Sequence, residues 1–166
     1  NSDALWMTTR DGYWLAGVYV PGSARSDLCI IHFYGHNETL RSAEFITQAR
    51  QHLDTALLCF DYRGYGASTG RPNEGDFYAD AEFIFDWLVD NHPGLKAVAC
   101  GRSLGAAVAT HLAGIRPVSG LALISAPTNM VDIVRPIFPP DEIIIEEAIP
   151  FRFDTLSGIP KIGRAH

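Results

Sequence analysis

The sequence is poor in cysteine, and its three cysteines suggest neither a disulfide framework nor a metal site. Cys29, Cys59 and Cys100 each fall inside a short apolar run, and none belongs to a C-x-x-C pair. Cysteines placed in this way are usually small buried hydrophobic residues. We therefore expect three buried thiols and no metal site. Buried free thiols are compatible with a reducing compartment, and we expect the cytoplasm.

An excess of positive charge is also missing. The chain has 13 Lys and Arg residues against 19 Asp and Glu residues, which gives a formal net charge of -6. Such a chain offers no basic stripe for a phosphate backbone, so nucleic acid is excluded as a partner. No apolar run approaches the roughly 18 to 20 residues of a membrane span, and no signal-peptide pattern is visible. Because the first residue is Asn1, an upstream anchor or signal stays open, and so does membrane association.

Internal repeats and low-complexity segments are not found either, and the composition is that of one globular domain. The 166 residues are 47% hydrophobic, which is enough for a sizeable core. Apolar runs predict strands at 13–20, 28–34, 55–60, 96–100 and 120–124. Since helical patterns separate them, we expect an α/β domain with a mostly parallel sheet and helices on both faces.

Apolar residues at helical spacing predict two of the helices, at 45–53 and 77–88. Asp76 and Asp80 are expected at the N-terminus of the second helix, where negative charge is favourable. A third helix, rich in small residues, is predicted directly after Ser103.

The run Gly101-Arg102-Ser103-Leu104-Gly105 lies between the predicted strand at 96–100 and this third helix. Glycines two residues either side of a serine permit a tight strand-to-helix turn that holds the serine in a strained conformation. In open α/β sheets the ligand site lies at the carboxyl ends of the strands, which is where Ser103 falls. We therefore predict Ser103 as a nucleophile; the alternative is a simple helix N-cap, a position that serine favours.

Together with this elbow, two further segments make the sequence resemble the α/β-hydrolase family of serine hydrolases. Residues 9–15 are similar to the family's opening hairpin, and residues 60–70 (Phe-Asp-Tyr-Arg-Gly-Tyr-Gly-Ala-Ser-Thr-Gly) are similar to the loop after its fourth strand. The second segment points to the Bem46-like branch, which groups esterase-like and S33 or S9 peptidase-like hydrolases. The resemblance implies the α/β-hydrolase fold, with about six of the usual eight strands present.

In that branch a His-Gly-Asn-type loop supplies the oxyanion hole, and residues 33–39 correspond to it here. Tyr34 stands where the family usually has histidine, and His36 where it often has asparagine. The resemblance implies that Ser103 attacks an ester, thioester or amide carbonyl of a small-molecule or peptide substrate. The backbone amides of His36 and Leu104 would hold the oxyanion, and no cofactor would be needed.

Residues 60–70, which we call the signature loop, contain two charged residues that could be catalytic, Asp61 and Arg63. Loop residues that orient a turn are more common than those that touch substrate, so we interpret both as scaffold residues.

The acid and histidine that complete a serine triad are not found in the expected places. In the family the acid follows a strand that comes after a segment like 153–162, and the histidine follows the next strand. The chain stops before both, so Asp154 is not interpreted as the acid, and Asp132 and Asp141 are expected to be exposed helix-end charges.

We therefore expect residues 1–166 to form a single, incomplete α/β-hydrolase domain that is inactive by itself and prone to aggregate, with a cap-like insertion at 128–153. A non-catalytic binding protein that kept the elbow and lost the triad stays open as the alternative.

The histidines offer few substitutes for the missing base. Four are expected in the core, on a helix face or at the opposite edge of the sheet: His32, His52, His92 and His111. His36 is on the edge of the sheet that carries the elbow, so it stays open as a surrogate base. His166 belongs to residues 162–166, which match one reading frame of a common sequencing adapter, and we expect this tail to be non-native.

Overall fold

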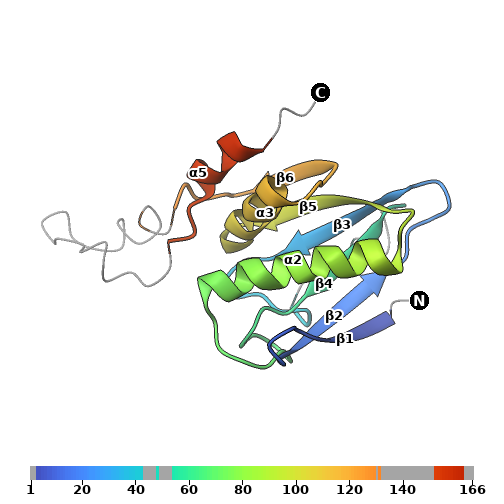
Figure 1. Ribbon diagram of the computed structural model, residues 1–166, viewed down its shortest axis with the longest axis horizontal. Coiled ribbons are helices and arrows are strands. Elements are labelled where there is room, and N and C mark those ends of the chain that lie inside the picture. Colours follow the sequence, from blue (N-terminus) through green and yellow to red (C-terminus); the bar gives the residue numbers. More distant parts are fainter. Residues whose placement is uncertain (1–2, 43–47, 49–53, 130, 132–151, 163–166) are drawn as a thin grey trace, which may run out of the picture.

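The computed structural model describes residues 3–42, 48, 54–129, 131 and 152–162 (Figure 1). Its strands form one six-stranded sheet in the order β1-β2-β4-β3-β5-β6. The strands are β1 Asp3–Thr8, β2 Trp14–Val20, β3 Leu28–Phe33, β4 Ala56–Phe60, β5 Lys96–Arg102 and β6 Gly120–Ile124. Strand β3 pairs in parallel with β4 and β5, and β5 pairs in parallel with β6. Strand β2 pairs antiparallel with β1 on one side and with β4 on the other. The predicted α/β fold with a mostly parallel sheet is confirmed.

The strand predictions are close to the observed bounds, with one informative difference. Predicted strands at 28–34, 55–60 and 120–124 match β3, β4 and β6 to within one residue at each end. Strand β5 extends two residues beyond the predicted end, to Arg102, so it delivers the chain directly to Ser103. Strand β1 pairs with β2 and forms the opening hairpin, whose register places Thr8 opposite Trp14.

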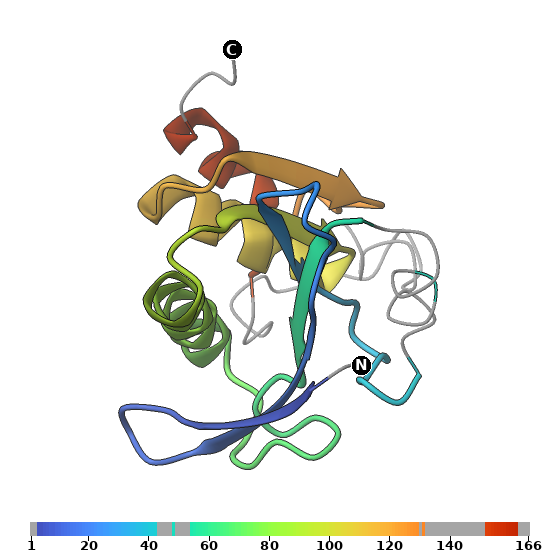
Figure 2. The ribbon, with the colours of Figure 1, turned by 90° about the vertical axis from the view of Figure 1, so that its right-hand side faces the viewer.

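Two helices cover one face of the sheet, α2 (Glu74–Asn91) and α3 (Leu104–Ile115). They contact each other and lie on the same side of the strands (Figure 2). Helix α2 is longer than predicted and begins after Asn73, whose side-chain oxygen accepts a 2.9 Å hydrogen bond from the Gly75 amide. A short helix, α5 (Thr155–Gly158), continues into the 3-10 turn η3 (Ile159–Lys161) and packs on α3.

The main core lies between these helices and the sheet. Ile31, Leu58 and Val108 belong to one cluster of buried residues with the apolar face of α2, which is the face that the sequence pattern predicts. The three cysteines are free and buried, as expected: Cys29, Cys59 and Cys100. None of the helices in the described part of the chain is long and apolar enough to cross a membrane.

Several sequence predictions fall on residues outside those that the structure describes. They are the helix at 45–53 apart from Gln48, most of the cap-like insertion at 128–153, Asp132, Asp141, His52 and His166.

Candidate active site

Ser103 occupies the turn between β5 and α3 in a backbone conformation that non-glycine residues rarely adopt. Its φ is 51° and its ψ is -119°. The Ser103 amide donates a 3.0 Å hydrogen bond to the Ile124 carbonyl on β6, and the Ser103 carbonyl accepts one from Ala106 at 2.9 Å. The half-buried side chain makes no capping hydrogen bond to the described backbone, so its hydroxyl does not act as a simple helix cap.

Two glycines make this turn possible because a side chain at either position would overlap backbone atoms. A Cβ on Gly101 would collide with the carbonyl oxygen of Gly105, and a Cβ on Gly105 would collide with the carbonyl oxygen of Phe33. The first contact allows the tight turn itself. The second presses the start of α3 against the end of β3, which brings Ser103 to the loop that follows β3.

The loop after β3 lies directly beside the nucleophile position. A Cβ on Gly35 would be 3.5 Å from the Ser103 Cβ. The preceding residue, Tyr34, is buried, and its hydroxyl donates a 2.6 Å hydrogen bond to Asp61 Oδ1. Burial raises the pKa of Tyr34 well above its ordinary value, and the Asp61 carboxylate raises it further, so the hydroxyl remains a donor. Tyr62 donates a 2.9 Å hydrogen bond to the Tyr34 carbonyl, which fixes the loop from the other side.

His36 and Leu104, the two predicted oxyanion-hole residues, lie at this same edge of the sheet. Leu104 is buried and is the first residue of α3, where backbone amides point out of the helix end. His36 follows Gly35, is exposed, and shares a 2.7 Å hydrogen bond through Nδ1 with the Tyr65 hydroxyl. Neither backbone amide donates to another described residue. Both residues thus lie next to elements that contact Ser103, and their role as oxyanion-hole donors stays a prediction.

Asp61 connects the loop after β3 to the signature loop. Its buried carboxylate accepts hydrogen bonds from the Tyr34 hydroxyl, from the Leu40 amide at 2.8 Å and from the Ala67 amide at 3.1 Å. Gly66 adopts a φ of 51°, and a Cβ there would collide with the Asp61 carboxylate. Asp61 therefore organises two loops, which agrees with the predicted scaffold role. Sequence reasoning did not identify Tyr34 as its partner.

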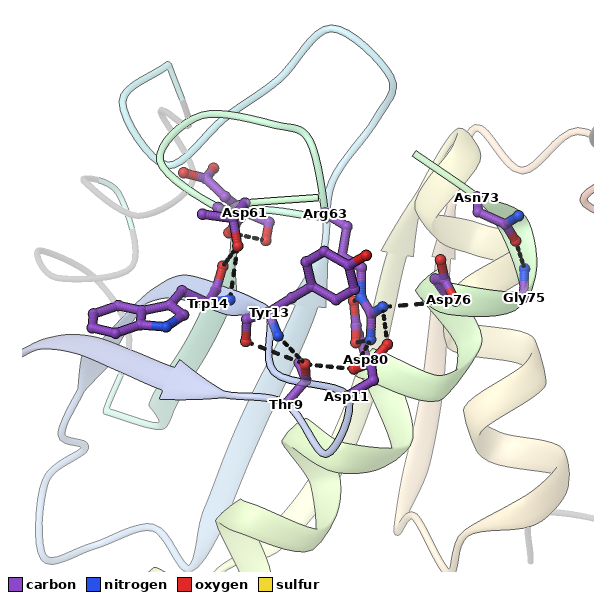
Figure 3. Close-up of polar contacts among 12 residues, drawn as sticks. Thr9, Asp11, Tyr13, Trp14, Asp61, Arg63, Asn73, Gly75, Asp76 and Asp80 are labelled. Atoms are coloured by element: carbon purple, nitrogen blue, oxygen red, sulfur yellow. Dashed lines mark hydrogen bonds and ion pairs between the residues drawn. The ribbon is translucent and has the colours of Figure 1, made fainter. Parts of the chain in front are cut away.

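Arg63 has the scaffold role that the sequence predicted, with partners from two distant elements (Figure 3). Its buried guanidinium makes two 2.7 Å hydrogen bonds to Asp80 on α2, and it pairs with Asp11 in the turn between β1 and β2 at 2.5 Å. The guanidinium also lies 4.8 Å from the centre of the Tyr13 ring. It therefore ties the signature loop to both the hairpin and α2.

The interpretation of Asp80 as a helix-end charge was wrong. Because α2 begins at Glu74, Asp80 lies in its second turn, faces inward and binds Arg63. Asp76 is in the first turn, as expected. The pKa of Asp11 is lowered to about 2, mainly by its hydrogen bond from Arg63, whereas burial raises the pKa of Asp80 against the opposing effect of Arg63.

The hydrogen bonds shown for the described histidines go to other residues: His36 pairs with Tyr65 and His111 with Glu82. His32 is buried in β3, where burial lowers its pKa to about 4 and keeps the imidazole neutral near pH 7. His111 stacks on Tyr78 with ring centres 4.3 Å apart, and His92 stacks on Tyr19 at 4.4 Å. His32 and His111 therefore have the core and helix-face positions that the sequence predicted.

Asp154 caps α5 and accepts a 3.0 Å hydrogen bond from the Ser157 amide. This carboxylate therefore has a structural role as a helix cap. The described residues thus bring a strained serine to the loop after β3, and no described side-chain hydrogen bond joins an acid or a histidine to its hydroxyl.

The sequence is similar to a known protein family and to several individual proteins. A family model described as serine aminopeptidase, S33, matches residues 22–145. An uncharacterized protein of Mycobacterium tuberculosis is 35% identical over 133 residues, which cover 76% of this chain and 46% of the relative. Protein bem46 of Schizosaccharomyces pombe is 34% identical over 92 residues, or 52% of this chain and 30% of the relative. The chain therefore spans about half or less of the length of these relatives.

Among solved structures, an esterase from Pyrococcus furiosus superimposes with a TM-score of 0.65 at 25% sequence identity. The match covers 77% of this chain and 50% of the esterase.

Proposed function

This chain belongs to the serine aminopeptidase S33 family of α/β-hydrolases, in the Bem46-like branch, and from that premise we propose that Ser103 is the nucleophile of a serine hydrolase. The observation that carries the proposal is the backbone of Ser103, with its φ of 51°, in a turn that lies beside Gly35 of the neighbouring loop. Strain of this kind persists only where the surrounding structure enforces it, and such residues cluster at active sites.

In the proposed reaction, Ser103 Oγ attacks the carbonyl carbon of an acyl substrate and passes its proton to a base. The carbonyl oxygen becomes an oxyanion, which accepts hydrogen bonds from the backbone amides of Leu104 and His36. Collapse of this tetrahedral intermediate expels the alcohol, thiol or amine, which takes the proton from the base. Water then hydrolyses the acyl-enzyme. Esters are the favoured substrate class because the similar Pyrococcus furiosus protein is an esterase.

The base and its orienting acid are proposed to come from sequence of the natural gene product that these 166 residues do not contain. The described residues place neither at the Ser103 hydroxyl, and β6 lies at the edge of the described sheet with Ile124 42% exposed, where further strands can pair. The 166 residues alone should then be inactive. One observation, the lack of a described base at Ser103, also favours a second candidate: a binding protein that retains the elbow without chemistry.

Ester hydrolysis tests the proposal and separates these candidates. The gene product that contains these 166 residues should hydrolyse p-nitrophenyl esters of short acids, and Ser103→Ala should lower kcat by about 10⁴-fold or more because the nucleophile is removed. A gene product that binds such esters without Ser103-dependent turnover would be a binding protein.

A further inference from the structure

One carboxylate, that of Glu38, contacts both sides of the candidate active site. Its Oε2 accepts a 2.7 Å hydrogen bond from the Gly35 amide, and its Oε1 forms an ion pair with Nη1 of Arg102. The Glu38 amide also donates to the Gly35 carbonyl at 3.3 Å, so main chain and side chain both close the turn at 35–38. Gly35 directly precedes His36, and Arg102 directly precedes Ser103. The pair thus joins residues 33–39, which we call the oxyanion loop, to the end of β5.

The ion pair with Arg102 also reduces the net negative charge of Glu38 and its surroundings near Ser103. A Cβ on Gly35 would be 3.3 Å from Glu38 Oε2 and 3.5 Å from the Ser103 Cβ, so the carboxylate and the nucleophile both lie beside Gly35. The Glu38 side chain is 26% exposed, and partial burial weakens the screening of its charge. Without Arg102, this charge would repel the oxyanion that develops at Ser103.

We propose that Glu38 and Arg102 form a positioning clamp, which holds the oxyanion loop over Ser103 while Arg102 neutralises the Glu38 carboxylate. The inference rests on the proposed function, since a binding protein would have no oxyanion to protect. It assigns a role to Arg102, the residue between Gly101 and Ser103. Neither residue touches the reacting atoms; both act through the amide donors and the local charge.

The charge role predicts a specific pattern in the gene product with a p-nitrophenyl ester as substrate. Arg102→Ala should lower kcat about tenfold with little change in KM, which is less than the 10²- to 10³-fold loss from removing an oxyanion donor outright. Glu38→Gln, which keeps an acceptor for the Gly35 amide without the charge, should lower kcat only about twofold to threefold. Arg102→Lys should recover most of the loss because it restores the charge.

The double variant Glu38→Gln/Arg102→Ala is the decisive member of this set. Once the carboxylate is neutral, loss of Arg102 should cost almost nothing further, so the double variant should be several times faster than Arg102→Ala alone. A double variant as slow as Arg102→Ala, or slower, would overturn the charge role. The matched control is Lys96→Ala, which breaks the exposed Lys96–Asp27 pair at the opposite end of β5 and should leave kcat unchanged.

A second measurement does not depend on turnover. Glu38→Ala removes the acceptor of the Gly35 amide, so hydrogen exchange at Gly35 should become about tenfold faster or more, while Lys96→Ala should leave it unchanged. Unchanged exchange at Gly35 would overturn the positioning role even in an active protein. Absence of any Ser103-dependent turnover in the wild type, with the expected exchange result, would instead identify the proposed function as the failure.

Discussion

The hydroxyl of Tyr34 donates a 2.6 Å hydrogen bond to the carboxylate of Asp61, and both side chains are buried. The two residues come from different loops, 27 positions apart, and their contact fixes the loop that faces Ser103. Tyr34→Phe should therefore destabilise the protein by about 1–3 kcal/mol, because a buried carboxylate loses a donor. The chemical denaturation midpoint measures this. Tyr13→Phe, which removes only an exposed hydroxyl, is the matched control, and equal effects of both changes would contradict the account.

A larger loss of stability is expected when Arg63 is removed. Arg63→Ala would leave Asp80 buried without its cation, and breaking a buried pair in this way costs about 3–5 kcal/mol. Arg10→Ala, at a side chain that is 87% exposed, should change stability by less than about 0.5 kcal/mol. Thermal or urea unfolding of the two variants gives the comparison, and a mild effect at Arg63 would show that its network contributes little.

The close approach of α3 to β3 makes Gly105 a sensitive position. Gly105→Ala places a methyl group against the Phe33 carbonyl, so α3 must shift, and we expect both a lower unfolding temperature and loss of most activity. Gly94→Ala is the control because a Cβ there would meet no atom within 4 Å. If Gly105→Ala behaved like Gly94→Ala, the start of α3 would have more room than the structure indicates.

The buried imidazole of His32 should make stability depend on pH. Burial lowers its folded-state pKa from 6.5 to about 4, so its contribution is fully present above pH 6.5 and is lost as pH falls towards 4. Urea midpoints measured between pH 7 and 4 should decline over this range. In His32→Asn the overall stability is lower, but this part of the slope should disappear; an unchanged slope would show that other groups cause it.

Local sequence patterns predicted the sheet well because strands and glycines carry local signals. Apolar runs identified β3, β4 and β6 almost to the residue, and the glycines around Ser103 predicted a strained turn that the structure shows. These features depend on neighbours within a few positions.

Contacts between distant residues could not be obtained in this way. Asp80 was placed at the helix N-terminus because the apolar pattern begins at Phe77, whereas α2 begins at Glu74. The pattern also does not show that Arg63 of a distant loop packs on this helix. The Glu38–Arg102 pair joins residues 64 positions apart, and nothing near either residue indicates the other. Only the packing of β3 beside β5 brings them together.

The most direct test of the central claim is covalent labelling of Ser103 by a fluorophosphonate probe, located by peptide mass spectrometry. The gene product should be labelled on Ser103, Ser103→Ala should not be labelled, and the 166 residues alone should show no labelling above the Ser103→Ala background. A gene product that stays unlabelled at Ser103 would contradict the role of this serine as a nucleophile, and strong labelling of the 166 residues alone would contradict the proposal that its base lies beyond them.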